Sequence, residues 1–313
     1  MRPCFIIAAA SVAVLVTVAE PAQAQANRTF VSGHGSDSNP CSLAAPCRSF
    51  QQAHNQTNAG GEITILDPAG YGSVTIDKSV SIVNDGVGEA GVTVTSGTSA
   101  ITVNVGASDV VNLRGLTLVG SGGGLNGVLF SNRGTLNIQN CVIRGFVTNG
   151  LALAPAGTAA FSVSDTIVSG FAVAEIAVVS SGSGTVTAAF NRVQAIGNGN
   201  SGFKIDGSNS TGAVNVTIAN SAATNNVVGI LTQSFNGAAL TQVMVSTSIL
   251  SNNSSTGVLD EGANSTIYLA KNTIAGNTGA FGTLSGGQVF SFGGNYIKGN
   301  IDDGGTIPLV SAK

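Results

Sequence analysis

The residues best suited to acid–base chemistry lie in the second half of the chain. Lys204 and Asp206 alternate along one predicted strand, and Asp260 and Glu261 end a predicted strand two repeats later. Carboxylates several ångströms apart can hydrolyse a glycosidic bond, and a cation beside a base can promote β-elimination. We therefore take Lys204, Asp206, Asp260 and Glu261 as the candidate catalytic residues.

The same region could bind a ligand without reacting with it. Stacked strands would place Lys204, Asp206, Gln233 and Glu261 on one outward surface, which Arg192 could approach from the preceding repeat. Such a surface could hold a sugar, or calcium through its carboxylates. The simpler interpretation is that a soluble rod carries some charge outside, and that opposite charges on neighbouring strands stabilise it modestly. We predict no metal site and no cofactor, with calcium as the alternative left open.

The chain between Gly120 and Gly299 repeats itself every 23 to 28 residues. Each copy holds a short apolar strand that ends in Gly or Asn, and residues 110–134, 135–159 and 160–184 align without a gap. Fixed-period self-similarity is typical of a solenoid, in which each repeat buries its apolar face against its neighbours. The glycines occur once per copy, whereas sequential hairpins would show paired turn residues. The predicted fold class is therefore all-β: a right-handed, single-stranded parallel β-helix of about 8 to 10 coils with a short N-terminal capping helix.

Alternation along the strands assigns side chains to the inside or the outside of this helix. The predicted inward residues include Val128 and Phe130, Phe203 and Ile205, and Ile230 and Thr232, whereas Leu129, Lys204 and Leu231 face outward. Asn recurs at the turns, where it tolerates the left-handed backbone and can bond to the amide of the next coil. The predicted turn residues are Asn198, Asn225, Asn226, Asn252, Asn253, Asn277 and Asn300.

The two ends of the chain differ from the repeats. Arg2, a short apolar run and Ala22-Gln23-Ala24 predict a signal peptide over 1–24, cleaved after Ala24 or Ala26. We expect a cap over 27–62, the β-helix over 63–305 and a tail over 306–313. The tail has no helix signal, so either it folds over the last coil or another chain covers that coil.

The predicted cap contains a strand, a cysteine loop and the one convincing helix, roughly 47–58, ended by Gly60-Gly61. Cys41 and Cys47 bracket a short loop, and export would permit a disulfide between them. Cys141 occupies a repeat position that Leu116 fills in another copy, which favours a core-filling thiol over a reactive one.

Composition excludes several classes of partner. The chain has 12 Lys and Arg against 15 Asp and Glu, and it contains no basic run, which argues against nucleic acid. A mean hydropathy of +0.34 is too apolar for disorder. We expect no membrane span in the mature chain, because no later stretch approaches the length of apolar residues that a span requires.

The amino-terminal segment resembles that of exported bacterial right-handed parallel β-helix repeat proteins, a group within the pectin-lyase-like superfamily. The resemblance rests on Phe30-Val31-Ser32-Gly33, Gly35-Ser36-Asp37-Ser38-Asn39-Pro40, Ala45-Pro46, Arg48-Ser49-Phe50, Gln52-Ala53, Gly61-Glu62-Ile63-Thr64-Ile65-Leu66, Gly70-Tyr71 and Val74-Thr75-Ile76-Asp77-Lys78-Ser79-Val80-Ser81-Ile82. Cys41 and Cys47 depart from it, because relatives more often carry glycine and an aromatic residue there. The resemblance implies the fold strongly and function poorly, since members include lyases, hydrolases, epimerases and adhesins.

The motifs of pectin-cleaving relatives are not assembled in this sequence. Gly33-His34-Gly35 matches one tripeptide but precedes the coils, and Asp302-Asp303 lies beyond the last repeat, where we expect a solvated turn. The chain also has no Trp and only 3 Tyr, although sugar-binding grooves usually present aromatic faces. We therefore predict a secreted or periplasmic, non-catalytic protein that is structural or adhesive, with a polysaccharide or cell-surface glycan as partner. The alternatives are a polysaccharide lyase or hydrolase, and then a tailspike-like or toxin-like trimer.

Overall fold

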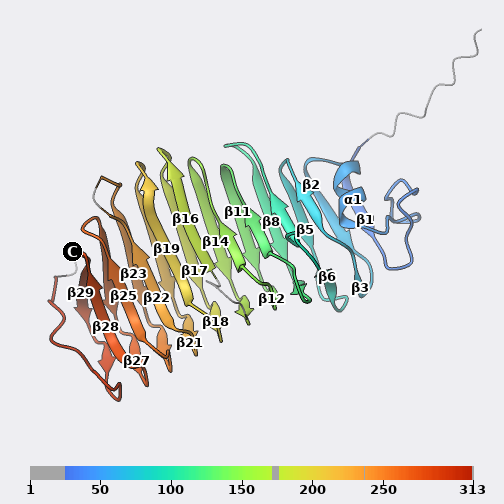
Figure 1. Cartoon of the computed structure of the whole chain (residues 1–313). Coiled ribbons are helices and arrows are strands. Elements are labelled where there is room, and N and C mark those ends of the chain that lie inside the picture. Colours follow the sequence, from blue (N-terminus) through green and yellow to red (C-terminus); the bar gives the residue numbers. More distant parts are fainter. Residues whose placement is uncertain (1–24, 171–175, 236, 312–313) are drawn as a thin grey trace, which may run out of the picture.

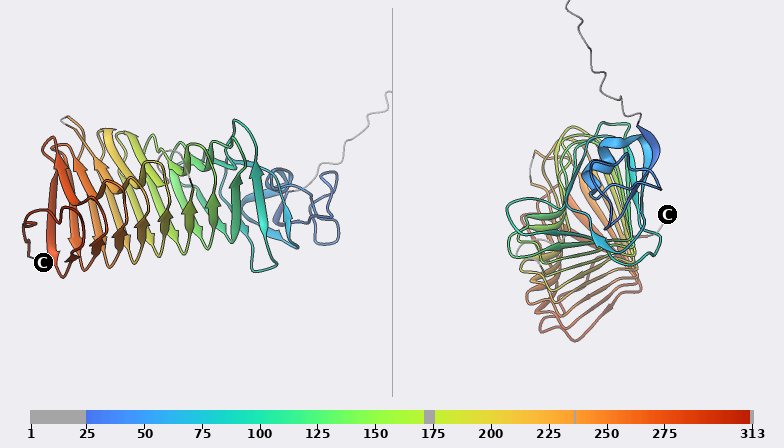
Figure 2. Two further views of the ribbon diagram at one scale, coloured as in Figure 1. Left: turned by 60° about the horizontal axis from the view of Figure 1, so that its bottom comes forward. Right: turned by 90° about the vertical axis from the view of Figure 1, so that its right-hand side faces the viewer.

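The computed structural model describes residues 25–170, 176–235 and 237–311, which wind into one elongated parallel β-helix (Figures 1 and 2). Within these residues there are three parallel sheets and one helix, and the coil makes about ten turns. The predicted fold class is thus confirmed. The predicted signal peptide lies outside the described residues.

Each complete turn contributes one strand to each sheet, and we name the sheets A, B and C. Sheet A contains, in order, β1 (Ala26–Val31), β2 (Thr57–Ile65), β5 (Val80–Val83), β8 (Val110–Arg114), β11 (Gly134–Gln139), β14 (Ala159–Ser164), β17 (Val186–Asn191), β20 (Val214–Ala219), β23 (Thr241–Ser246), β26 (Ser265–Ala270) and β29 (Gln288–Gly293). Sheet B contains β3 (Ala69–Gly70), β6 (Ala90–Val94), β9 (Leu116–Gly120), β12 (Val142–Arg144), β15 (Ile167–Ser169), β18 (Gln194–Ile196), β21 (Ala222–Thr224), β24 (Ile249–Ser251), β27 (Thr273–Ala275) and β30 (Tyr296–Ile297). Sheet C contains β4 (Val74–Ile76), β7 (Ile101–Val103), β10 (Asn126–Phe130), β13 (Asn149–Leu153), β16 (Ile176–Gly182), β19 (Ser201–Ser210), β22 (Val228–Gln233), β25 (Thr256–Glu261) and β28 (Gly279–Leu284).

The register of the strands builds a continuous apolar core. In sheet A, equivalent positions pair from turn to turn, so that Val163, Phe190, Ile218, Val245 and Leu269 form one buried column. Because alternate residues point to opposite faces, a shift of one strand by one residue would move its apolar side chains to the outer face. The burial of every second residue therefore fixes the register. The six inward residues predicted from alternation are all buried.

Asparagines at one corner of the coil form a buried ladder along the rod. The side-chain Nδ2 of Asn226 donates to Oδ1 of Asn253 (3.1 Å), Asn253 donates to Asn277 (2.9 Å), and Asn277 donates to Asn300 (2.9 Å). Beside this ladder, Asn225 and Asn252 turn the chain with φ of 60° and 57°, a left-handed backbone that Asn tolerates. The roles predicted for the turn asparagines therefore hold along this corner.

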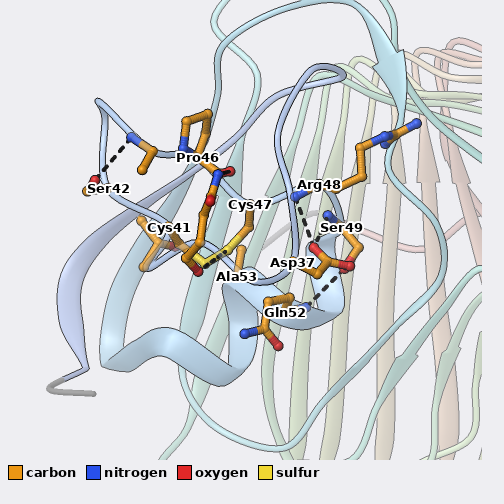
Figure 3. Close-up of a disulfide and its surroundings, with 12 residues drawn as sticks. Asp37, Cys41, Ser42, Pro46, Cys47, Arg48, Ser49, Gln52 and Ala53 are labelled. Carbon is orange, nitrogen blue, oxygen red and sulfur yellow. Dashed lines mark hydrogen bonds between the residues drawn. A yellow bond between two sulfur atoms is a disulfide. The ribbon is translucent and has the colours of Figure 1, made fainter. Parts of the chain in front are cut away.

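The amino end is closed by a compact cap (Figure 3). Cys41 and Cys47 form the predicted disulfide. The Asp37 carboxylate accepts hydrogen bonds from the backbone N–H groups of Arg48 and Ser49, both at 2.9 Å, and ties the cysteine loop to the start of α1 (Phe50–Gln56). The buried face of α1, which includes Phe50, packs against β1, β2 and β4.

This helix is shorter than the predicted 47–58, and Gly60-Gly61 do not end it. Thr57 already has an extended backbone and begins β2, which pairs with β1. Its hydroxyl donates to the carbonyl of Ala53 (2.6 Å) and bonds with the Thr29 hydroxyl (2.8 Å), so a buried side chain fixes the change from helix to strand.

The carboxyl tail folds over the last coil, one of the two arrangements left open by the sequence. Leu309 bridges to Ser291 of β29, and Asp302 bridges to Gly279 of β28. The sequence predicts only a solvated turn at Asp303, but this residue has a structural role. Its Oδ1 accepts hydrogen bonds from the backbone N–H and the Nδ2 of Asn300, both at 3.0 Å. Asp303 therefore ends the asparagine ladder.

Candidate functional site

Lys204 and Asp206 lie on the outer face of sheet C, as predicted, and pair with each other. Lys204 Nζ is 3.2 Å from Asp206 Oδ2, and Asp206 Oδ1 accepts from the backbone N–H of Ser208 at 3.0 Å. Along its own column Lys204 is followed by Leu231 and Leu259. The lysine therefore has an apolar neighbour in the next turn and its carboxylate partner on the same strand.

Asp206, Gln233 and Glu261 form one outward column on three successive turns. Gln233 Nε2 donates to Glu261 Oε2 at 2.7 Å. The structure therefore brings together the residues that we predicted as a ligand surface. Their polar atoms are, however, largely bonded to one another or to the backbone.

Asp260 does not belong to this surface, and its predicted place was wrong. It is in register with Thr232, which points inward, so its side chain enters the core and is fully buried. Its Oδ2 accepts from the backbone N–H of Gln288 at 2.7 Å, whereas Oδ1 has no hydrogen-bond partner. Burial raises the pKa of Asp260 to about 6. Asp260 and Glu261 are adjacent in sequence but lie on opposite sides of the sheet wall.

Arg192 also lies elsewhere than we expected. Its guanidinium makes two hydrogen bonds to the Asp165 carboxylate, Nε–Oδ1 at 2.6 Å and Nη2–Oδ2 at 2.8 Å. Both residues have positive φ, 55° and 52°, at the corner after sheet A. This bidentate pair links two turns of the rod on its surface. Arg192 therefore does not extend the predicted ligand surface of Lys204 and Asp206.

A different feature, an open groove on the outer face of sheet A, was not found from the sequence. It has a volume of about 470 Å³ and crosses five successive strands, from β14 to β26. Its outward lining residues are Thr187, Ala189, Asn215, Thr217, Gln242, Met244 and Tyr268. None of the residues that line it is acidic or basic. Hydroxyl and amide groups therefore alternate with apolar surface along the groove.

The groove is hollow because its side chains are small at one end and large at the other. Ala189, Thr217, Met244 and Tyr268 occupy one outward column in register. Side-chain size therefore rises along the rod, and the aromatic ring of Tyr268 closes the end that lies toward β29.

An aromatic cluster supports that closed end. The Tyr268 ring stacks with Phe290 at 5.8 Å between centroids and with Phe292 at 5.6 Å. Tyr268 and Phe290 are partly exposed, and Phe292 is exposed. The outer face of sheet A therefore carries exposed aromatic surface, although the chain has no Trp and only 3 Tyr.

Register could have revealed the groove in the sequence. The segments AAFSV, VTAAF, VNVTI, TQVMV and STIYL occupy equivalent strands, and their outward letters read as small, polar and then aromatic. The charged residues that indicate acid–base chemistry in the sequence all lie outside this groove.

The one free cysteine of the described residues is structural. Cys141 is a buried free thiol, and burial raises its pKa to about 11, so it fills the core in its protonated form. In the described ranges, no three His, Cys, Asp or Glu side chains gather closely enough to hold a metal ion.

The part of the chain that the structure describes contains no helix long and apolar enough to cross a membrane.

No protein-family model matches the chain, and no curated protein sequence matches it. Among solved structures, the chain is similar to a rhamnogalacturonan lyase, with a TM-score of 0.48, 15% sequence identity, and coverage of 79% of this chain and 73% of the lyase.

Proposed function

We propose that this protein is an exported, non-catalytic β-helix protein of the cell envelope or extracellular space that binds glycan through the groove of sheet A. The observation that carries the proposal is the groove itself, an uncharged channel across five strands that ends at Tyr268. Hydroxyl and amide side chains can exchange hydrogen bonds with sugar hydroxyls, and an aromatic ring can pack against the C–H face of a sugar. We further propose membership of the pectin-lyase-like superfamily.

The positions of the ionisable side chains favour binding over catalysis. A general acid or base must reach the bond that it acts on. Asp260 lies inside the rod, and Glu261 accepts a hydrogen bond from Gln233. None of the four candidate catalytic residues lines the groove.

Export is supported by the signal-like segment over 1–24 and by the Cys41–Cys47 disulfide, a bond that is rare in reducing compartments. Expression from the full gene should yield a mature protein that begins at Gln25 or Asn27. Amino-terminal sequencing of the secreted or periplasmic fraction checks this. A full-length chain retained in the cell would contradict it.

The test of function combines binding and cleavage on the same set of polysaccharides. Affinity electrophoresis should show retardation of the protein by at least one glycan, with no new chain ends and no unsaturated products. Cleavage that is abolished by Asp206→Ala or Glu261→Ala would replace this proposal with the lyase or hydrolase alternative. Repeating the assay with calcium and with a chelator tests the open alternative of a calcium-dependent surface.

A further inference from the structure

We propose that the groove binds a neutral polysaccharide whose chain lies extended along the rod axis, anchored at Tyr268. This inference rests on the proposed function, because it specifies the ligand of the same groove. Three observations carry it: the charge of the lining, the direction and length of the groove, and the support of the Tyr268 ring.

The lining fits a neutral ligand. A uronic acid polymer places a carboxylate on each sugar, and such groups are usually recognised by Arg or Lys. The groove offers hydroxyl and amide groups such as Thr187, Asn215 and Gln242, and no cation. The cation at the neighbouring corner, Arg192, is already paired with Asp165. A neutral sugar can use these hydroxyl and amide groups without leaving a carboxylate unpaired.

The groove runs across the strands, and therefore along the rod. A second hollow of about 170 Å³ adjoins it at Thr187 and extends the surface to β11. Its lining includes Thr135, Thr158 and Thr185, and it also has no acidic or basic residue. From β11 to β26 there are five strand steps, which at the usual spacing of about 4.8 Å span about 24 Å. A single sugar would leave most of this length uncovered, whereas an extended chain would fill it.

The Tyr268 ring is held in place before any ligand arrives. Phe290 and Phe292 of β29 pack against it, and the groove lies toward β23. A ring that is already ordered loses little conformational entropy on binding, so its contact with a sugar contributes more to affinity. Met244, the neighbour of Tyr268 in register, adds an adaptable apolar surface.

The experiment is calorimetric titration of the mature protein with two matched sets of oligosaccharides. One set consists of neutral glucose, mannose and xylose oligomers of increasing length, and the other of galacturonate oligomers of the same lengths. We expect neutral oligomers to bind, with an affinity that rises with length and then levels off once the chain spans the groove. Added salt should leave that affinity unchanged, because no charge is neutralised.

Two substitutions and a control locate the site. Tyr268→Ala should weaken binding about tenfold, whereas Tyr268→Phe should retain most of it because the ring face remains. Tyr296→Ala is the matched control, since Tyr296 is an exposed tyrosine on sheet B, and it should bind like the wild type. Thermal unfolding of each variant checks that the rod is intact.

The other outcomes are distinct from one another. Preferential binding of galacturonate oligomers, weakened by salt, would overturn the neutral ligand and leave the glycan-binding function standing. Neutral binding that Tyr268→Ala leaves unchanged, in a folded variant, would overturn the assignment to this groove. Binding of neither set, nor of any polysaccharide in the wider panel, would overturn the proposed function as well.

Discussion

Sheets A and C each gain one strand from every complete turn, yet their outer faces use polar side chains in opposite ways. On sheet C, Lys204 pairs with Asp206, and Gln233 bonds to Glu261, so the charged and amide groups engage one another. On sheet A, the uncharged groups that line the groove surround an open hollow ending at Tyr268. On this rod, the charged side chains therefore lie on the surface whose polar groups are already bonded to one another, whereas the uncharged surface is open to a ligand. Substitutions on each face test this difference.

The largest effect should come from Asp260, which is buried behind sheet C. Its pKa is raised to about 6, so the folded state binds a proton more tightly than the unfolded chain. The contribution of Asp260 to the stability of the fold is therefore fully present at low pH and is lost as the pH rises through about 6. Asp260→Asn should stabilise the protein by about 2 kcal/mol near pH 8 and give no gain near pH 4.

Chemical denaturation at both pH values measures this, with Asp85→Asn as the control because that carboxylate is exposed. An equal effect of Asp260→Asn at both pH values would contradict a buried, titrating Asp260. Such a result would indicate that the Asp260 side chain lies on the outer surface, and it would weaken the contrast between the two faces.

Filling the groove should weaken its binding of glycan. Ala189→Trp places a large ring among small outward side chains, so glycan affinity should fall by about tenfold or more while the fold persists. Ala275→Trp is the control, because Ala275 occupies an outward position on sheet B. The titration described for Tyr268 serves here too. Equal affinities for the two tryptophan variants would show that the ligand lies elsewhere.

Removing the Gln233–Glu261 hydrogen bond should affect stability and leave binding intact. The double variant Gln233→Ala with Glu261→Ala should lose about 1 kcal/mol of stability, since the pair is only partly buried. Glycan affinity should stay within about twofold of the wild type, because double substitutions far from a site rarely couple to it. Loss of binding would make sheet C the ligand surface and reverse the comparison.

The smallest effect should come from the Lys204–Asp206 pair. Lys204→Ala should cost about 0.5 kcal/mol of stability, and added salt should reduce even that difference. Denaturation at low and high salt measures it. A large loss that is insensitive to salt would mean that the lysine stem, rather than its charge, packs against Leu231.

Much of the fold could be predicted because the sequence repeats at a nearly constant period. Inward residues such as Phe203 and Ile205 follow from alternation, and the disulfide and the turn asparagines follow from local spacing. The end of the helix at Gln56 did not follow, because it depends on a hydrogen bond between Thr57 and Thr29, which are distant in sequence.

The candidate site was harder to predict for a different reason. Asp260 and Glu261 appeared to form one acidic pair, although adjacent strand residues must face opposite sides. Thr232 had already been assigned inward, and register with it would have placed Asp260 in the core. The groove is a property of several strands together, so no single segment reveals it.

The asparagine ladder has a direction, and Asp303 gives it a boundary. Each amide receives a hydrogen bond from the coil before it and passes one to the coil after it, so a further coil could always be added. A carboxylate can receive such a bond but, when ionised, has none to pass on. The rod therefore presents no donor at the end of this ladder, whereas an amide at position 303 would present one to a strand added beyond it.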